Sequence, residues 1–149
     1  MKLIATMPCR NEDWIIGLSI RAALRWCDGV AVLNHASTDR TGAILDEIQR
    51  ETGRLNIINE PDPEWCEMKH RHRLLKQARA MGATHIAIVD ADEVLTGNLL
   101  PTIRDQIDQM PPGACIQIPM RNMYGGIDQY RSDASCWGRA ITTVAFCDN

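Results

Sequence analysis

The chain has 149 residues, which is close to the commonest size of a single domain and enough to bury one substantial core. Apolar residues make up 45% and charged residues 23%, near the averages of soluble globular proteins, so disordered and fibrous chains are excluded. The formal net charge of -3 argues against non-specific nucleic-acid binding, which needs an excess of Lys and Arg. We expect one soluble domain, residues 1–149, with no nucleic-acid partner.

The first apolar run of the chain is too short for a signal-peptide core and is broken at Pro8. No stretch of about 18 apolar residues, the length that a membrane-spanning helix needs, occurs anywhere. The six cysteines contain no C-x-x-C pair or other close metal-ligand spacing. We therefore predict a cytoplasmic protein with reduced thiols and no transmembrane segment.

Short apolar runs alternate with helical patterns along the chain. Strands are predicted at residues 2–7, ended by Pro8, and at Val30–Leu33, Leu55–Ile58 and His85–Val89, with a half-buried strand at Ala114–Met120. Helices are predicted at Trp14–Trp26, from Ile44 to a stop at Gly53, at Glu64–Met81, and from Thr96 to Met110. This alternation is typical of βαβ units, so we predict an α/β fold with a mostly parallel sheet covered on both faces.

The helix predicted at Glu64–Met81 is long and unusually basic. Its spacing places Met68, Leu75 and Ala78, with Trp65, on the inward face. A solvated charged surface is the usual meaning of such a basic run. Alternatively Arg71 and Arg73 approach a diphosphate, because Arg is suited to bidentate phosphate contacts.

Three polar clusters follow predicted strands, at Pro8–Glu12, Asn34–Asp39 and Asp90–Glu93. In an open parallel sheet, ligands bind beyond the carboxyl ends of the strands, where such loops converge. The three clusters are therefore expected to form one site.

Asp90 and Asp92 are separated by one residue at the end of a buried strand. Two carboxylates in this arrangement can point the same way and hold a hard divalent cation, Mn²⁺ or Mg²⁺, with positions left for a diphosphate. The alternative is that these acids, with Glu93, cap the next helix or face water.

Four segments together resemble glycosyltransferase family 2. They are Met7-Pro8-Cys9-Arg10-Asn11-Glu12, Val32-Leu33-Asn34-His35-Ala36-Ser37-Thr38-Asp39-Arg40-Thr41, Arg73-Leu74-Leu75 with Ala78 and Gly82-Ala83-Thr84-His85-Ile86, and Val89-Asp90-Ala91-Asp92-Glu93. The resemblance covers about residues 3 to 100. It implies a GT-A, three-layer α/β/α fold for the chain, in which residues 1–100 form the nucleotide-sugar-binding half and 101–149 a partial acceptor side.

The resemblance also implies a site for a nucleotide-diphospho-sugar donor, with the Asn34–Asp39 loop beside the base and Asp90 near the ribose or sugar. The residues expected to bind the nucleotide sugar are Pro8, Arg10, Asn11, Glu12, Asn34, Ser37, Asp39, Arg71, Arg73, Asp90 and Ala91. The metal, Mn²⁺ or Mg²⁺, is expected on Asp92 and Asp90.

Two departures from the family pattern bear on these expectations. Asn34, His35 and Ala36 stand where the family usually has acidic residues, which leaves the donor base open. Family domains usually run well past the length of this chain and carry the acceptor site and general base there. Asp128 and Asp133 are the candidates for a base that would deprotonate the acceptor hydroxyl.

Three hypotheses follow. The first is an inverting glycosyltransferase acting on an unknown saccharide, lipid or protein acceptor. The second is a non-catalytic nucleotide-sugar-binding module, or a truncated domain without the acceptor site and base. The third is an interaction domain in which the acidic strand end and the basic helix pair with each other. A sheet edge at Ile141–Phe146 could also be covered by a second chain, giving a homodimer.

Overall fold

The computed structural model describes residues 1–126, 128–130 and 141–148. In chain order the elements are β1 (Leu3–Cys9), α1 (Ile16–Ala23), β2 (Gly29–His35), α2 (Thr41–Thr52), β3 (Leu55–Glu60), α3 (Glu67–Ala80), β4 (His85–Ile88), α4 (Ile103–Asp108), β5 (Cys115–Ile118) and β6 (Thr142–Cys147). Strands and helices alternate as far as β5, as the sequence predicts.

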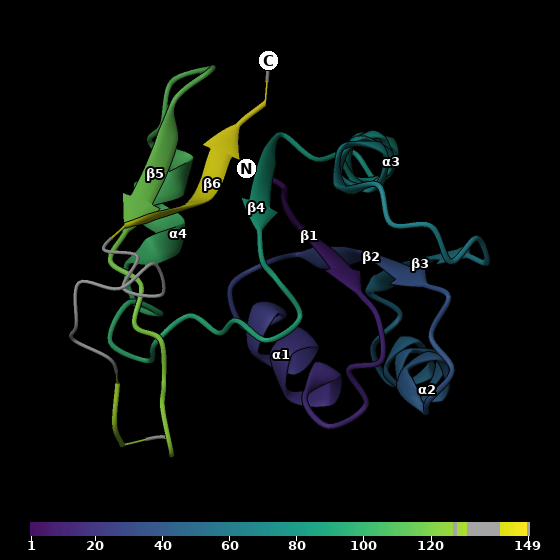
Figure 1. Cartoon of the computed structure of the whole chain (residues 1–149). Coiled ribbons are helices and arrows are strands. Elements are labelled where there is room, and N and C mark those ends of the chain that lie inside the picture. The colour runs from purple at the N-terminus through teal and green to yellow at the C-terminus, as the bar shows by residue number, and fades with distance from the viewer. Residues whose placement is uncertain (127, 131–140, 149) are drawn as a thin grey trace.

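The strands form a six-stranded sheet with the order β3-β2-β1-β4-β6-β5 (Figure 1). The first four strands of this order, β3, β2, β1 and β4, are parallel, whereas β6 runs antiparallel to both β4 and β5. The predicted α/β class with a mostly parallel sheet is confirmed.

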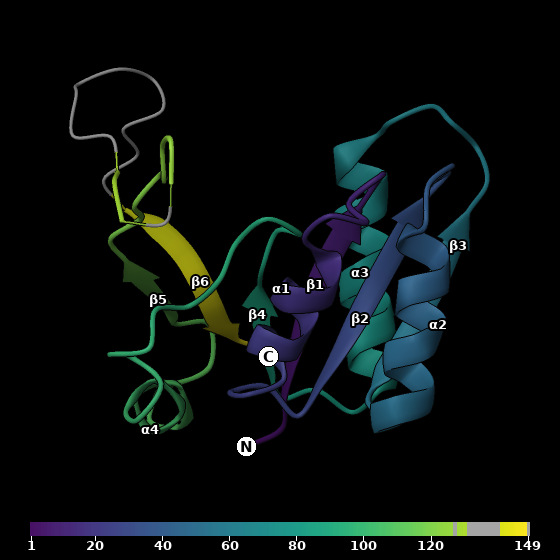
Figure 2. The same ribbon diagram turned by 90° about the horizontal axis from the view of Figure 1, so that it is seen from below.

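Helices cover both faces of the sheet (Figures 1 and 2). On one face, Leu3, Ala5 and Met7 of β1 share a core with buried residues of α1, α2 and α4. On the other, Ile4 packs with Leu74 and other buried residues of α3 and β2. Successive side chains of a strand point to opposite faces, and an apolar strand such as β1 therefore supplies both cores. The arrangement is the predicted three-layer α/β/α fold.

β1 does not end at Pro8 as predicted but continues in register with β2 to Cys9. The carbonyl oxygen of Thr6 accepts the backbone N–H of Val89 at 3.2 Å, so alternate residues of β1 face β4. The backbone of Pro8, two residues after Thr6, also faces the side of β4, but β4 has already ended at Ile88. Pro8 is tolerated inside the strand because its missing N–H has no ladder partner to lose.

The predicted inward face of α3 is wrong at Met68, whose side chain is 83% exposed. The buried residues of the helix are His70, Leu74 and Ala78, which recur every four residues and form one stripe on the sheet. Met68 lies outside this stripe. The error arose because Met68 is apolar and was assigned to the buried face, whereas the polar His70 was not.

The predicted sheet edge at Ile141–Phe146 is also wrong. β6 lies inside the sheet and pairs with β4 on one side and with β5 on the other. The edges of the sheet are β3 and β5. Homodimerisation stays a prediction, but this strand offers no open edge to a second chain.

Five cysteines lie in the part of the chain that the structure describes, and none of them forms a disulfide. They are Cys9, Cys27, Cys66, Cys115 and Cys147. Within the described ranges, no helix has the length and apolar character needed to cross a membrane.

Leu74→Ala tests the buried stripe of α3. Leu74 is fully buried between α3 and the sheet, so its truncation should lower the free energy of unfolding by about 2–5 kcal/mol through lost burial and a residual cavity. Urea denaturation measures this change. The matched control is Met68→Ala on the same helix, which should change the free energy by no more than about 0.5 kcal/mol. Equal losses in the two variants would contradict the assigned face.

Candidate functional site

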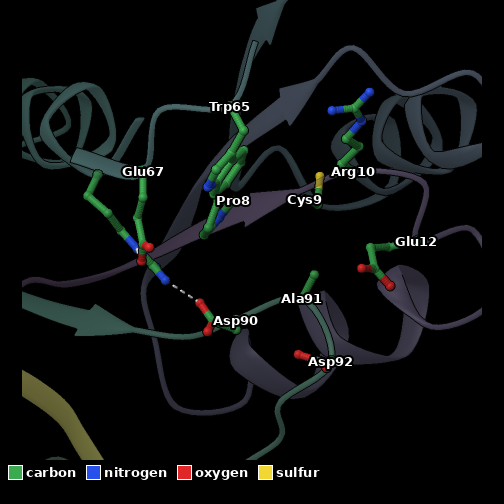
Figure 3. Close-up of a pocket in the computed structure, with 10 residues that line it drawn as sticks. Pro8, Cys9, Arg10, Glu12, Trp65, Glu67, Asp90, Ala91 and Asp92 are labelled. Carbon is green, nitrogen blue, oxygen red and sulfur yellow. Dashed lines mark hydrogen bonds and ion pairs between the residues drawn. The ribbon is translucent and has the colours of Figure 1, made fainter. Parts of the chain in front are cut away.

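A cavity of about 300 Å³ lies where the strand order of the sheet reverses, between the carboxyl ends of β1 and β4 (Figure 3). From β1 the chain proceeds outward through β2 to β3, and then returns to the other side of β1 as β4. The loops after β1 and β4 therefore diverge and leave a crevice, which is the usual ligand position in open α/β sheets. The cavity is lined by Pro8, Cys9, Arg10, Glu12, Trp65, Glu67, Arg71, Asp90, Ala91 and Asp92.

Carboxylates reach the cavity from both strand ends. Asp90 and Asp92 follow β4, and Glu12 follows β1 on the opposite side (Figure 3). Burial, and next the negative charge of Asp92, raise the pKa of Glu12 above its ordinary value. Burial and the charge of Asp90 likewise raise the pKa of Glu93, which accepts a weak hydrogen bond from the backbone N–H of Asp90 at 3.3 Å. The acids repel one another, so this end of the cavity favours a cation.

The described residues contain no group of three or more His, Cys, Asp or Glu side chains placed to hold a metal ion. A Mg²⁺ or Mn²⁺ ion is commonly bound by one or two carboxylates and completes its shell with water and substrate phosphates. Asp92 is exposed and makes no described hydrogen bond or ion pair, so its oxygens are available as ligands. The donor set therefore fits a hard divalent cation shared with a diphosphate.

Arg71 supplies a positive charge to the cavity from α3. Its Nη2 lies 2.6 Å from Oδ1 of Asp90, and its Nε lies 3.6 Å from Oε1 of Glu67, one turn earlier on the helix. The Arg71 side chain remains 31% exposed, so its guanidinium can also reach a bound anion. The cavity thus offers carboxylates and a guanidinium within one small volume.

Arg73, predicted beside Arg71 at the diphosphate, does not line the cavity. Its guanidinium pairs with the carboxylate of Glu60 at the end of β3, and Lys69 approaches the same carboxylate at 3.6 Å. Arg71 and Arg73 are two residues apart on a helix and therefore point in different directions. Arg10, by contrast, lines the cavity, while one of its nitrogens donates to the carbonyl of Pro63 at 3.2 Å.

The loops after β1 and β2 are tied together by Asn11. Asn11 has the positive φ of 54°, its N–H donates to Oγ of Ser37 at 3.1 Å, and its Oδ1 accepts the N–H of Thr38 at 2.8 Å. Asn is one of the few residues besides Gly that tolerates this backbone conformation. The predicted site residues Asn11 and Ser37 are thus together, but they join the loops and do not line the cavity.

Asp39 and Thr41 form a second tie between the same loops. The carboxylate of Asp39 accepts the N–H groups of Asp13 at 3.1 Å and Thr41 at 2.9 Å, while Oγ1 of Thr41 accepts the N–H of Glu12 at 2.8 Å. Slight burial opposes ionisation of Asp39, but these hydrogen bonds prevail and hold its pKa below the ordinary value. Asp39 therefore helps to position Glu12 from outside the cavity.

Two further predicted residues, Asn34 and Asp128, do not line the cavity. Asn34 is half-buried in β2 and donates to Oδ1 of Asn59 at 3.1 Å. Asp128 is exposed and does not line the cavity. Asp133 lies outside the described residues.

Cys9, Trp65 and Glu67 line the cavity but were not among the predicted site residues. Burial, and then the charge of Glu12, raise the pKa of Cys9 to about 12, so its thiol stays protonated and contributes shape. Trp65 is 47% exposed and precedes α3 in an irregular segment, although the sequence pattern placed it on the inward face of the helix. The sequence signal that could have assigned Trp65 to the cavity is its place in the proline-containing segment with Pro61 and Pro63, before the helix.

The family model described as glycosyl transferase family 2 matches residues 5–145. The chain belongs to glycosyl transferase family 2. The matched range contains every residue that lines the cavity, and the resemblance stated from the four sequence segments is confirmed. No match was found among curated proteins.

Solved structures share the GT-A fold with this family member. The structure of S. aureus TarS 1-349 has a TM-score of 0.65 at 20% identity over 85% of this chain and 37% of that chain. The mannosyltransferase PcManGT from Pyrobaculum calidifontis, in complex with GDP-Man and Mn²⁺, has a TM-score of 0.58 at 18% identity over 79% and 34%. A 4-diphosphocytidyl-2C-methyl-D-erythritol synthase has a TM-score of 0.60 at 15% identity over 98% and 74%. This chain therefore spans about a third of the length of the TarS and mannosyltransferase chains.

Substitution of Asn11 tests the tie between the loops. Asn11→Ala removes the acceptor of the Thr38 N–H and places a β-carbon in the left-handed region, so it should destabilise the protein by about 2 kcal/mol. Asn11→Gly removes the same hydrogen bond without the strain and should be about 1 kcal/mol more stable than the Ala variant. Chemical denaturation compares the two. An Ala variant as stable as the Gly variant would show that the backbone at this position is not constrained.

Proposed function

We propose that the protein binds a nucleotide-diphospho-sugar and transfers its sugar to an acceptor. The single observation that carries the proposal is the cavity at the β1/β4 reversal, where Asp90 and Asp92 meet Glu12 and Arg71. Membership in glycosyl transferase family 2 supports the reaction class. The Mn²⁺ and GDP-Man in the structurally similar mannosyltransferase support a diphosphate donor with a divalent ion.

In this proposal Asp92, with Asp90, holds a Mn²⁺ or Mg²⁺ ion, which when bound neutralises charge on the departing diphosphate. Arg71 binds a phosphate oxygen beside Asp90, while it keeps Asp90 oriented through their 2.6 Å ion pair. Cys9, Pro8 and Ala91 are buried and give this part of the cavity an apolar surface that limits water. These residues orient the donor before reaction.

Transfer would proceed with inversion at the anomeric carbon. The acceptor oxygen forms a bond to that carbon while the bond from carbon to the β-phosphate oxygen breaks, and the nucleoside diphosphate leaves with the bonding electron pair. The hydroxyl proton passes to a carboxylate that must lie within hydrogen-bond reach. Asp128 and Asp133 stay the predicted candidates for this base.

A non-catalytic nucleotide-sugar-binding module is the second candidate. One observation favours it: Asp128, the described candidate for the base, does not line the cavity. The two functions share the donor site and differ in turnover. Binding without transfer or hydrolysis across a panel of donors and acceptors would decide for the module.

Asp92→Asn tests the metal role. Titration calorimetry of the protein with nucleoside diphosphates and Mn²⁺ should show binding that EDTA abolishes in the wild type. Loss of one charged ligand should weaken metal-dependent binding by about tenfold to a hundredfold in the Asn variant, in the range seen when a metal site loses a supporting group.

Asp46→Asn is the matched control for charge, since Asp46 is exposed on α2 and does not line the cavity. This variant should bind the diphosphate and Mn²⁺ as the wild type does. Metal-dependent binding that survives intact in Asp92→Asn would remove Asp92 from the proposed site.

Arg71→Ala distinguishes a phosphate-binding residue from a generally basic helix. Removing a guanidinium that contacts phosphate should weaken diphosphate binding by about tenfold or more, because charged hydrogen bonds contribute about 1.5–3 kcal/mol. The control is Lys76→Ala, an exposed basic residue of the same helix that carries the same formal charge. Equal losses of affinity in both variants would indicate that α3 acts only through its net charge.

A further inference from the structure

Two buried histidines pack against each other between α3 and the sheet. They are His35, at the carboxyl end of β2, and His70, in the first half of α3. Both residues are 0% exposed, and their ring centroids lie 4.7 Å apart. Among the described residues, none of the four ring nitrogens has a hydrogen-bond partner. Buried polar groups are almost always paired, so this contact is unusual for a protein core.

The charged groups that act on the pair come from β3 and from α3 itself. Glu60 of β3 lies opposite His35 in the strand register. Its carboxylate is bound by Arg73 and approached by Lys69 at 3.6 Å, both on α3. Glu60 favours protonation of His70, whereas these two cations oppose it. The acid that would stabilise an imidazolium is therefore already neutralised.

His70 is held in its neutral form by its surroundings. Burial, and next the neighbouring His35, hold the pKa of His70 below its ordinary value. An imidazolium buried without an acceptor is strongly disfavoured, because burial removes its hydration. The segment that leads into α3 adds two acids, Asp62 and Glu64, but both are exposed to solvent, which screens their charge. A proton taken up by the pair therefore destabilises the contact between the two rings.

The same contact supports one wall of the cavity. Trp65 packs edge-on against both imidazoles, with its ring centroid 5.1 Å from that of His35 and 4.7 Å from that of His70, and it lines the cavity (Figure 3). Trp65 belongs to residues 61–66, which form no helix or strand and are exposed. Arg71, next to His70 on α3, lines the cavity as well. The two histidines thus lie where this segment and α3 meet the sheet.

We infer that the pair of His35 and His70 is a pH-sensitive switch, which releases residues 61–66 and the first half of α3 from the sheet when it takes up a proton below neutral pH. Release exposes the rings to water, where an imidazolium is stable. The rest of the sheet need not open, because local opening of one element costs less than global unfolding. Since Trp65 and Arg71 lie on the released part, acidification loosens one wall of the cavity. The inference goes beyond the proposed function, because the switch needs no ligand.

The direction of the pH dependence follows from the lowered pKa of His70. The open form binds a proton below the ordinary histidine pKa of about 6.5, whereas the closed form binds it only at lower pH. The closed form therefore keeps its full stability above about pH 6.5 and loses stability as the pH falls below that value. By linkage, one such proton raises the opening equilibrium about tenfold between about pH 7.5 and about pH 5.5.

Hydrogen exchange followed by mass spectrometry tests the switch on the full chain without ligand. After correction for the intrinsic effect of pH on exchange, the opening equilibrium of the amides of residues 70–74 should be about tenfold larger at about pH 5.5 than at about pH 7.5. The amides of α2, which packs in the core of the other face of the sheet, should not change. An equal increase in α2 and α3 would contradict the inference, because it would indicate loss of the whole fold.

Substitutions then assign the proton to the pair. His35→Leu and His70→Leu should each reduce the increase, and the double variant should abolish it. His70→Gln carries no titrating group and should behave like His70→Leu. His72→Leu, at an exposed histidine of the same helix, is the control and should keep the full increase. His85, the fourth histidine of the chain, lies at the amino end of β4, so the amides of residues 70–74 do not report on it.

Thermal melting at about pH 7.5 checks that the variants fold. Replacing an unpaired buried imidazole by an apolar side chain of similar size should leave the melting temperature unchanged or raise it. A double variant that keeps the tenfold increase of the wild type would overturn the inference. A wild type whose α3 amides open equally at the two pH values would also overturn it.

Discussion

The site depends on one constraint of the sheet: β4 ends before β1 does. Thr6 is the last residue of β1 that pairs with β4, opposite Ile88, while β1 continues beside β2 to Cys9. The unpaired side of this extension is occupied by Pro8, which has no N–H to satisfy, so the gap costs no ladder hydrogen bond. The chain after Ile88 turns away and brings Asp90 and Asp92 opposite the loop that carries Glu12. The cavity is therefore a consequence of strand length and strand order, and the course of the backbone sets the positions of its side chains.

The charges around this gap are balanced unequally. Arg71 pairs with Asp90, which leaves Asp92 and the partly buried Glu12 facing each other without a cation. Such repulsion lowers stability in the absence of a ligand, and a divalent cation would relieve it. A diphosphate alone would add negative charge to the same end of the cavity. The electrostatics thus disfavour an anion alone at this end of the cavity.

Much of the fold follows from local sequence patterns, because parallel strands buried on both faces read as short apolar runs between helical segments. The converging loops were predicted for the same reason, since each follows such a run. What failed depended on contacts distant in sequence. The place of β6 between β4 and β5 has no local signal, and Met68 could be recognised as exposed only once His70 was known to be buried. Arg73 and Arg71 look alike in the sequence, and only the position of Glu60 separates them.

The Ser37–Asp39 loop shows why a family motif need not consist of ligand-binding residues. Its side chains accept the backbone N–H groups of Asn11 and Asp13, the residues on either side of Glu12. The loop therefore positions the carboxylate of Glu12, which lines the cavity, although the loop itself does not line it. Conversely, His35 lies just before this loop and plays no part in these hydrogen bonds. The ring nitrogens of His35 and His70 are buried without a hydrogen-bond partner among the described residues, which costs stability. Local disagreement of this kind concentrates at functional sites, because there the residues serve a function and not only the stability of the fold.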